Sequence, residues 1–203
     1  MKNIIILATR NPTKLVQIQA LFVGSPFEIV TLDQAGIEGD AVEDGSTLKE
    51  NAFKKARFAF DLFSSDTWTM ADDTGLFIDA LNGEPGIKSA RWLSDSSSTI
   101  DTSAYCLKRL EGVSNRSASF ETAVVVIDPC GDDYSFSGRI RGRILESPRV
   151  KPQPKMPYSC LFVPDGSEMS WAEMTTEMEN SISHRGKAFQ EARAWLESVI
   201  KDY

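Results

Sequence analysis

Two adjacent carboxylates carry the clearest chemistry in this chain of 203 residues. Asp72 and Asp73 lie in ADDTG, residues 71–75, at the end of an apolar stretch that predicts a strand. Neighbouring carboxylates repel each other, so a buried pair needs a cation or strong hydrogen-bond donors. Oxygen ligands of this type suit Mg²⁺, particularly where the phosphates of a substrate complete its coordination. The alternative is a solvated turn, in which Asp, Thr and Gly are common residues.

Glu50 offers a third carboxylate for the same cation. It also follows Thr47 by three residues, which is the capping-box spacing at the start of a helix predicted over residues 47–63. The sequence alone leaves both roles open. Lys88 and Arg91 lie in a segment with Gly and Pro, residues 82–92, that predicts a loop. Their side chains can face either an anion or solvent.

The segment ATRNPTK, residues 8–14, predicts a strand end, a tight polar turn and the start of a helix. Asn11 is a favourable N-cap and Pro12 a favourable first helical residue. Backbone N–H groups and the dipole at a helix N-terminus attract anions, and Lys14 adds a positive charge one turn into the helix. The segment therefore predicts a phosphate-binding site, with a purely structural helix start as the alternative.

His184 is the only histidine, and it stands in SISHRGKAF, residues 181–189, beside the predicted N-cap Ser183 of a C-terminal helix. A single histidine is compatible with a core residue, a helix cap, a catalytic base or a ligand-recognition group. Its neighbours Arg185 and Lys187 place positive charge at a helix N-terminus, where it opposes the helix dipole. Such a locally unfavourable arrangement indicates a functional role, for example contact with an anionic or carbonyl-rich ligand.

These residues must be positioned by a fold of mixed strands and helices. Periodicity predicts strands over residues 3–9, 27–32, 117–128, 133–145 and 157–166, and a strand that enters a turn over 67–81. Helices are predicted after residue 11, over 47–63, behind a polar linker within 96–113, and over 188–200. The two long strands, 117–128 and 133–145, are expected to pair as antiparallel neighbours. We expect one domain over residues 1–203 with an elongated α/β fold.

Composition argues against several classes of protein. A net charge of −7 argues against a broad nucleic-acid surface, and no apolar stretch reaches the roughly 18 residues of a membrane span. Three widely spaced cysteines, Cys106, Cys130 and Cys160, favour reduced thiols over disulfides or a zinc cluster. We therefore expect a cytoplasmic protein without a nucleic-acid or membrane partner.

Four segments taken together resemble the inosine/xanthosine triphosphate pyrophosphatase family. They are TRNPTK, EDGSTLKENAFKKA, ADDTGLFIDALNGEPGIKSARW and ENSISHRGKA, in this order, and the similarity extends over nearly the whole chain. The resemblance implies a homodimer with an elongated mixed-sheet α/β fold, in which two lobes surround a central nucleotide-binding cleft. It implies Mg²⁺-dependent hydrolysis of non-standard purine nucleoside triphosphates (ITP, dITP and XTP) to the monophosphate and pyrophosphate, which cleanses the nucleotide pool.

The resemblance also implies roles for individual residues. Asp73 is the expected catalytic carboxylate and a Mg²⁺ ligand, assisted by Glu50 and Asp72, and a carboxylate can orient or deprotonate the attacking water. His184 and Arg185 are expected at the base, where Arg185 can donate to a keto oxygen but cannot accept from an exocyclic amine. The other expected substrate-binding residues are Thr9, Arg10, Asn11, Pro12, Thr13, Lys14, Thr74, Met156, Tyr158, Ser159 and Glu179.

The chain departs from the family pattern at the expected base site. Where the family carries Gly-Phe-Gly-Tyr-Asp-Pro, this chain has KMPYSC, residues 155–160, so Met156 replaces the stacking Phe and Ser159 replaces Asp. Glu179 replaces a Lys, which exchanges a donor for an acceptor and reverses the charge. Either neighbouring side chains compensate and the family substrates are kept, or base specificity is altered or relaxed.

Two other classes of function compete with this hydrolase. A catalytically silent nucleotide-binding protein would bind without turnover, but binding alone does not need the acidic set around Asp73. A monophosphate or sugar-phosphate phosphatase would release orthophosphate, and an Asp-x-Asp nucleophile motif would favour it. ADDTG is not that motif.

Overall fold

One mixed sheet of seven strands forms the centre of the molecule. A computed structural model of the protein describes residues 3–63, 67–93 and 101–200. The strands lie in the order β2-β1-β3-β5-β6-β7, and short β4 also pairs with β3. β1 is parallel to β2 and β3, and the other pairs are antiparallel. The strands are β1 (Asn3–Leu7), β2 (Phe27–Thr31), β3 (Trp68–Ile78), β4 (Pro85–Gly86), β5 (Ser117–Ile127), β6 (Asp133–Ile144) and β7 (Phe162–Pro164).

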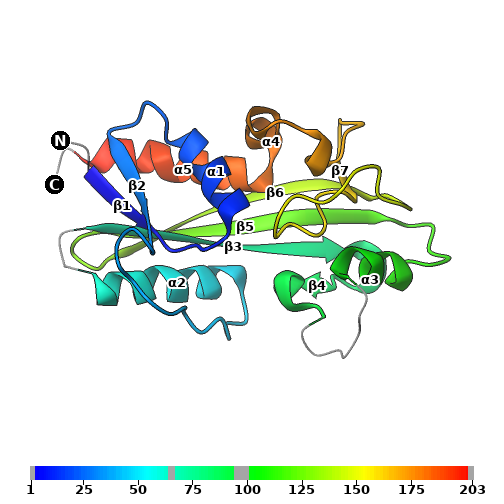
Figure 1. The fold of residues 1–203 in the computed structure, drawn as a ribbon, viewed down its shortest axis with the longest axis horizontal. Helices are drawn as coiled ribbons and strands as arrows, with labels where there is room; N and C mark the ends of the chain where they lie inside the picture. Colours follow the sequence, from blue (N-terminus) through cyan, green and yellow to red (C-terminus); the bar gives the residue numbers. More distant parts are fainter. Residues whose placement is uncertain (1–2, 64–66, 94–100, 201–203) are drawn as a thin grey trace.

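Within the described ranges, five α-helices pack around this sheet. They are α1 (Pro12–Leu21), α2 (Leu48–Leu62), α3 (Thr102–Arg109), α4 (Thr176–Ile182) and α5 (His184–Val199). Figure 1 shows an elongated molecule in which the long strands β3, β5 and β6 extend along the length. At the end that holds the two termini, α1 and α5 lie on one side of these strands and α2 on the other, whereas α3 lies toward the opposite end (Figure 1). The mixed α/β prediction is therefore confirmed.

Three helices begin at the predicted residues because each has a polar N-cap. Asn11 accepts from the backbone of α1, Thr47 from the N–H of Glu50, and Ser183 from the N–H of Gly186. Such caps satisfy backbone donors that a helix leaves without intrahelical partners. The antiparallel pairing of β5 with β6 is likewise confirmed over their whole lengths.

The hydrophobic core is divided between the two ends of the long strands. At one end, buried side chains such as Phe27, Trp68 and Phe189 pack between the sheet and α1 and α5, while alanines of α2 cover the other face. At the opposite end, a separate cluster includes Phe162 and Trp171. β3 and β5 contribute to the clusters at both ends, so they join two lobes.

Two predicted elements are wrong in detail. ADDTG is not a turn but the middle of the 11-residue strand β3, and it pairs with β5 throughout. Within residues 157–166, only Phe162–Pro164 form a strand, because residues 158–161 make turn hydrogen bonds instead. The predicted polar linker over residues 96–100 lies outside the described residues.

The structure also describes the three cysteines and the lengths of the helices. Cys106, Cys130 and Cys160 are free thiols. In the part of the chain that the structure describes, no helix is both long and apolar enough to cross a membrane.

Candidate active site

The site lies at a gap in one edge of the sheet. β1 pairs with β3 only as far as Met70, and β4 pairs with β3 from Leu76 onward. No described strand covers the same edge of β3 over residues 71–75. β1 ends at this gap and α1 begins there, and ligands of sheets with parallel strands bind near the carboxyl ends of those strands. ADDTG therefore borders an opening rather than a continuous sheet.

Asp72 and Asp73 escape mutual repulsion because adjacent strand residues point to opposite faces of a sheet. Asp72 is fully buried on the face of α1 and α5, where Lys14 Nζ lies 2.7 Å from its Oδ2 and Arg185 Nε lies 3.6 Å away. Burial alone would raise the pKa of Asp72, but the positive charges of Lys14, Arg185 and Lys55 hold that pKa well below its usual range. Asp72 is thus an ionised structural anchor for two cations.

Asp73 faces α2 and has its own partners. Lys55 Nζ lies 3.2 Å from Oδ1, and Asn51 Nδ2 donates to Oδ2 at 3.1 Å. Asn51 and Lys55 are four residues apart on α2 and therefore share one helix face. Burial acts to lower the pKa of Lys55. The neighbouring carboxylates, Asp73 foremost, outweigh that effect and raise the pKa above its ordinary value, so this ammonium stays charged. The buried pair is neutralised by two lysines and needs no metal for that purpose.

The start of α1 brings Lys14 to the site, but its first backbone donors are already used. The N–H groups of Thr13 and Lys14 donate to Asn11 Oδ1 at 3.0 and 3.4 Å. The backbone phosphate cradle expected here is therefore capped by Asn11 in this structure. The second bond is long, so the anion attraction rests on the helix dipole and on Lys14.

The side chain of Arg10 is engaged by other protein groups at the turn before α1 and is not free to bind a phosphate. Its guanidinium pairs with Asp33 and Asp40, and it donates to the carbonyl oxygens of Ile37 and Gly39. Thr9 accepts from the N–H of Asn11 through its hydroxyl. Arg10 is therefore held in place by the segment that follows β2, and Thr9 by the turn that precedes α1.

His184 is buried at the start of α5, and its ring stacks on Phe120 with centroids 4.9 Å apart. Desolvation, with the nearby charge of Arg185, lowers the pKa of His184 well below its ordinary value, so the imidazole is neutral. Nδ1 has no hydrogen-bond partner among the described residues. A neutral imidazole can contact a base but is not a cationic anion receptor.

Arg185 is more constrained than its expected role implies. It is 2% exposed, and Nη1 donates to Gln17 Oε1 at 2.6 Å. Nη2 lies 3.4 Å from Thr74 Oγ1, which in turn bonds to Asp72 and Thr122. These contacts leave little of the guanidinium free, so its reading of a keto oxygen stays a prediction.

The loop 153–159 closes the site from the other lobe. Thr13 Oγ1 donates to Pro154 O at 2.7 Å and Asn11 Nδ2 to Lys155 O at 3.3 Å, so the loop is bonded to the start of α1. Ser159 holds the loop in shape by accepting from Gln153 N and donating to Met156 O. Tyr158 also fixes the loop, because its hydroxyl donates a hydrogen bond to Ser89 O at 2.9 Å.

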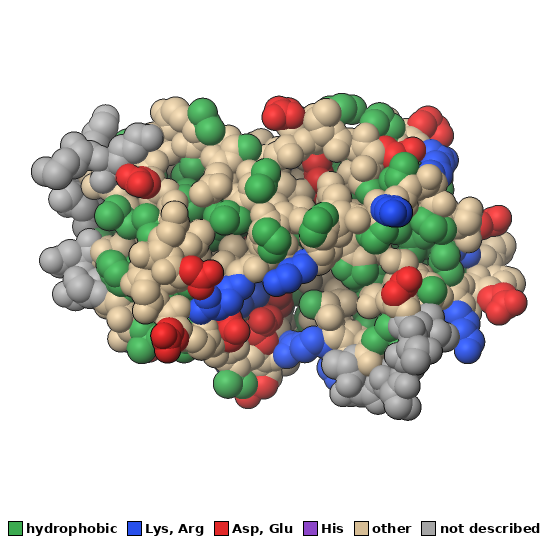
Figure 2. All heavy atoms as spheres, in the orientation of Figure 1, with side chains coloured by type: hydrophobic (Ala, Val, Ile, Leu, Met, Phe, Trp, Pro, Cys, Tyr) green, Lys and Arg blue, Asp and Glu red, His purple; other side chains and the backbone are tan. Residues whose placement is uncertain are grey.

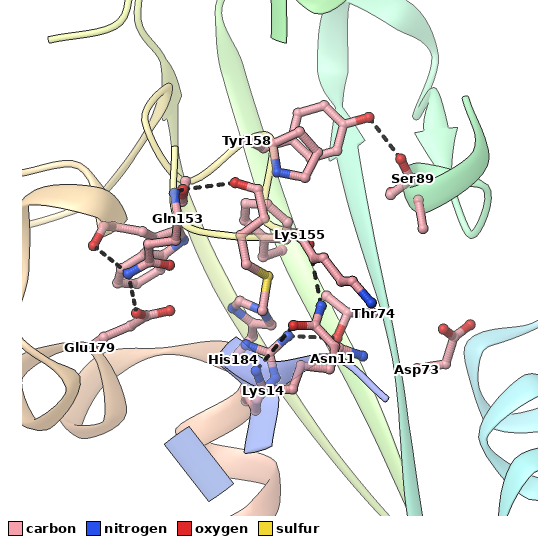
Figure 3. Close-up of a pocket in the computed structure, with 17 residues that line it drawn as sticks. Asn11, Lys14, Asp73, Thr74, Ser89, Gln153, Lys155, Tyr158, Glu179 and His184 are labelled. Carbon is pink, nitrogen blue, oxygen red and sulfur yellow. Dashed lines mark hydrogen bonds between the residues drawn. The ribbon is translucent and has the colours of Figure 1, made fainter. Parts of the chain in front are cut away.

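The side chains described above line two adjoining pockets. The first, here called the Glu179 pocket, is lined by Asn11, Lys14, Asp73, Thr74, Ser89, Ala90, Phe120, Gln153, Lys155, Met156, Pro157, Tyr158, Ser159, Trp171, Glu179, His184 and Arg185. The second, the Lys55 pocket, shares Asn11, Lys14 and Asp73 with it and adds Thr9, Arg10, Glu43 and Lys55. Figure 3 places Asp73 and Glu179 on opposite sides of the Glu179 pocket. Figure 2 shows Lys and Arg side chains gathered near the middle of one face of the molecule.

Most predicted site residues line one of these pockets, and four do not. Pro12 and Thr13 belong to the helix start, and Asp72 lies behind Lys14 and Arg185. Glu50 is on the exposed end of α2, where its carboxylate accepts from the backbone and hydroxyl of Ser46. Glu50 therefore supports the helix start, as its spacing from Thr47 allowed, and lies outside both pockets.

Several pocket residues were not identified from the sequence. Lys55 and Asn51 carried a detectable signal, since a polar pair at helical spacing lies beside the buried alanines of α2. Glu43 gave no signal, because only the fold brings it within 3.4 Å of Lys55. The lining residues of this kind include Glu43, Lys55, Phe120, Gln153, Lys155 and Trp171. Gln17, Asn51 and Thr122 were also not identified, and they hydrogen-bond to lining residues.

Of the three predicted Mg²⁺ ligands, Asp73 alone lines a pocket, where Glu43, which was not predicted, accompanies it. Asp73 and Glu43 line the Lys55 pocket together and both contact Lys55 Nζ, and Mg²⁺ is commonly held by one or two carboxylates plus substrate phosphates. Within the described residues, no group of three or more His, Cys, Asp or Glu side chains is arranged to hold a metal. The donor set therefore fits a cation that shares its ligands with a bound phosphate.

Comparison with known proteins places the chain in a family. The Ham1 family model matches residues 5–195, and the chain belongs to this family. A dITP/XTP pyrophosphatase of Thermoanaerobacter pseudethanolicus is 39% identical over 194 residues, which cover 95% of this chain and 96% of that protein. A dITP/XTP pyrophosphatase of Geobacter sulfurreducens is 38% identical over 186 residues, with 91% and 92% covered. The resemblance drawn from the four segments is thereby confirmed.

Solved structures agree with this assignment. The Staphylococcus aureus Ham1 protein superposes with a TM-score of 0.80 at 28% identity, covering 97% of this chain and 99% of that one. A HAM1 protein from Coxiella burnetii gives a TM-score of 0.79 at 30% identity, covering 99% and 100%. The fold is therefore shared over nearly the whole length.

Proposed function

We propose that this chain hydrolyses non-standard purine nucleoside triphosphates (ITP, dITP and XTP) to the monophosphate and pyrophosphate in the presence of Mg²⁺. One observation carries the proposal: Asp73 is the carboxylate shared by the Lys55 pocket, which holds several basic side chains, and the Glu179 pocket, which has aromatic walls. A triphosphate suits the Lys55 pocket, and a base suits the Glu179 pocket. The names of the relatives, dITP/XTP pyrophosphatase, support the same activity.

Asp73 is suited to orient and deprotonate the water that attacks the α-phosphorus. Its two oxygens each accept one hydrogen bond, from Lys55 and Asn51, and a carboxylate has about four acceptor sites in all. Those two bonds fix the side chain while leaving acceptor capacity for water. General-base catalysis of this type contributes about 10²- to 10⁴-fold to rate.

Lys14 and Lys55 neutralise the triphosphate and the departing pyrophosphate. Both ammonium groups are anchored by buried carboxylates, so they are oriented before the substrate arrives. Asp73 and Glu43 would hold Mg²⁺, which supplies further positive charge to the phosphates when bound. Lys14 and Lys55 therefore act by charge and position, and Asp73 acts on the proton.

The cellular setting completes the proposal. We infer a cytoplasmic homodimer with no nucleic-acid or membrane partner, on the basis of the family resemblance, the net charge of −7 and the free thiols. A light-scattering mass near twice 22.5 kDa would support the dimer, and a mass near 22.5 kDa would contradict it.

A turnover assay tests the activity. Purified protein with Mg²⁺ is given ITP, dITP, XTP, GTP, ATP, UTP and CTP in turn, and pyrophosphate and orthophosphate are measured separately. Pyrophosphate with the monophosphate is the expected product pair. Orthophosphate alone would indicate a phosphatase, and binding without turnover would indicate a silent nucleotide-binding protein.

Replacing Asp73 tests its role directly. Asp73→Asn keeps the shape and both neighbours but removes the base, so kcat should fall at least about 100-fold while nucleotide binding remains. Steady-state kinetics with calorimetric binding of ITP measures both. A variant that retains more than a tenth of the wild-type kcat would exclude Asp73 as the base.

A further inference from the structure

The far end of the Glu179 pocket carries a buried carboxylate. Glu179 belongs to α4, is 4% exposed, and lines the pocket together with Gln153 and Trp171. Figure 3 shows its carboxylate beside Gln153, on the side of the pocket opposite Asp73. Any base that fills this end of the pocket therefore meets Glu179.

This carboxylate has amide partners, Gln153 and Gln17, but no close cationic one among the described residues. Gln153 Nε2 approaches Glu179 Oε2 at 3.4 Å and is shared with Trp171 O at the same distance. In the part of the chain that the structure describes, no ion pair reaches Glu179, because the guanidinium of Arg185 lies against Asp72 and Gln17 instead. A buried carboxylate with such long and shared contacts retains acceptor capacity for a ligand.

Arg185 contributes a positive charge near Glu179, and the other side chains at this end of the pocket are uncharged. His184 is neutral and stacked on Phe120, and Met156 is apolar. Trp171 adds an aromatic ring whose buried Nε1–H has no hydrogen-bond partner among the described residues. Burial raises the pKa of Glu179, while Arg185 and hydrogen bonds from Gln153 and Gln17 oppose that rise. Acceptance of N–H groups from a ligand stabilises the ionised form and offsets the cost of burial.

We propose that Glu179 accepts hydrogen bonds from N–H groups at positions 1 and 2 of a purine base, so that the pocket favours a 2-amino base over a 2-keto base. The inference rests on the proposed triphosphate hydrolysis but goes beyond its substrate range, because it places GTP, a standard nucleotide, ahead of ITP and XTP. Guanine presents N1–H and the 2-amino group side by side, which matches the two oxygens of a carboxylate. Hypoxanthine presents N1–H alone.

Xanthine and adenine are disfavoured by the same chemistry. The 2-keto oxygen of xanthine is an acceptor and would face another acceptor, and the N1 lone pair of adenine leaves the carboxylate without its donor. A site whose buried polar group is left unpaired rejects a ligand far more strongly than an apolar pocket does. The expected order of kcat/KM is GTP, then ITP, then XTP, with ATP last.

Two variants at this position test the order. Glu179→Gln keeps the size but replaces one oxygen by a donor, so kcat/KM for GTP should fall and that for XTP should rise. Charge-assisted hydrogen bonds contribute enough for the GTP-to-XTP ratio to fall about tenfold to hundredfold. Glu179→Lys should invert the preference further. The outcome that overturns the inference is a wild-type protein that prefers XTP to GTP, or variants that change all substrates by the same factor.

A matched control lies on the same helix. Glu177 is exposed on α4, and Glu177→Gln makes the same change of charge outside both pockets. Its ratio of GTP to XTP should equal that of the wild type within twofold. Equal shifts in Glu177→Gln and Glu179→Gln would assign the effect to net charge and would also overturn the inference.

Binding of the products separates this inference from the proposed hydrolysis. Calorimetry with GMP, IMP and XMP needs no turnover, and affinity should fall in that order for the wild type and change order in Glu179→Gln. Absence of hydrolysis would defeat the proposed function while this binding order still decided the role of Glu179. Equal affinities for GMP and XMP would overturn that role even in an active enzyme.

Discussion

At the scale of residues, the two aspartates of ADDTG are separated by the pleat of β3. Asp72 faces Lys14 and Arg185, while Asp73 faces Lys55 and Asn51. One carboxylate is therefore an anchor and the other is available for chemistry. The sequence did not reveal these separate roles, because the lysines that neutralise Asp72 and Asp73 come from different helices.

Removal of Lys14 should destabilise the fold as well as the site. Lys14→Met leaves Asp72 buried beside one fewer cation, and breaking a buried ion pair of this kind costs about 3 kcal/mol in the free energy of unfolding. The double variant Lys14→Met with Asp72→Asn should recover most of that loss but not the activity. Urea unfolding and the pyrophosphate assay together measure this. A double variant no more stable than Lys14→Met would show that the pair is not the cause.

His184 should make stability depend on pH. Below its ordinary pKa of 6.5, the unfolded chain takes up a proton on His184, whereas desolvation and Arg185 keep the folded imidazole neutral. The free energy of unfolding should therefore decrease as pH falls below 6.5, by about 1.4 kcal/mol per pH unit from this group. His184→Asn removes that contribution. Urea unfolding at pH 7.5, 6.5 and 5.5 compares the slopes, and equal slopes in both proteins would contradict the assignment.

At the scale of elements, α5 approaches β6 so closely that one position admits only glycine. A Cβ at Gly138 would lie 2.0 Å from His184 O and 3.0 Å from Ala188 N, and both are backbone atoms. The start of α5, which carries His184 and Arg185, is therefore placed by direct contact with the strand. The base end of the site depends on this contact.

Gly138→Ala should move the start of α5. The added methyl group would clash with backbone atoms of α5, which cannot move aside as a flexible side chain can. We therefore expect a loss of at least about 2 kcal/mol in stability together with a raised KM. Ser137→Ala is the control, because Ser137 is exposed on the opposite face of the same strand and should change neither quantity. Thermal unfolding and steady-state kinetics measure both effects. Unchanged KM in a folded Gly138→Ala protein would separate the base site from this contact.

The helix starts were predictable because their signals are local. Asn11, Thr47 and Ser183 cap helices by contacts within three residues, so sequence spacing alone identified them. ADDTG was misassigned to a turn because its burial depends on cations from α1, α2 and α5. Glu43 in the candidate site was invisible for the same reason: its contact with Lys55 spans 12 residues of sequence and depends on the placement of α2.

At the scale of the whole molecule, the two pockets lie where the lobes meet. The start of α1 belongs to one lobe and the loop 153–159 to the other, and hydrogen bonds from Asn11 and Thr13 join them. The phosphate end is built from α1, α2 and β3, whereas the base end adds α4, α5 and the loop. A nucleotide that fills both pockets therefore contacts both lobes at once.

Ligand binding should consequently stabilise the two lobes as one unit. Asp73→Asn with ITP and Mg²⁺ at 100 times Kd should gain about 2.7 kcal/mol, which corresponds to a rise in Tm of about 5 to 10 °C for a protein of this size. Inorganic pyrophosphate is the control, since it reaches only the phosphate end and should give a smaller shift. Differential scanning calorimetry measures the transition, and hydrogen exchange should slow both at residues 8–14 and at 153–159. Two separate transitions, of which ITP moves only one, would show that the nucleotide engages a single lobe.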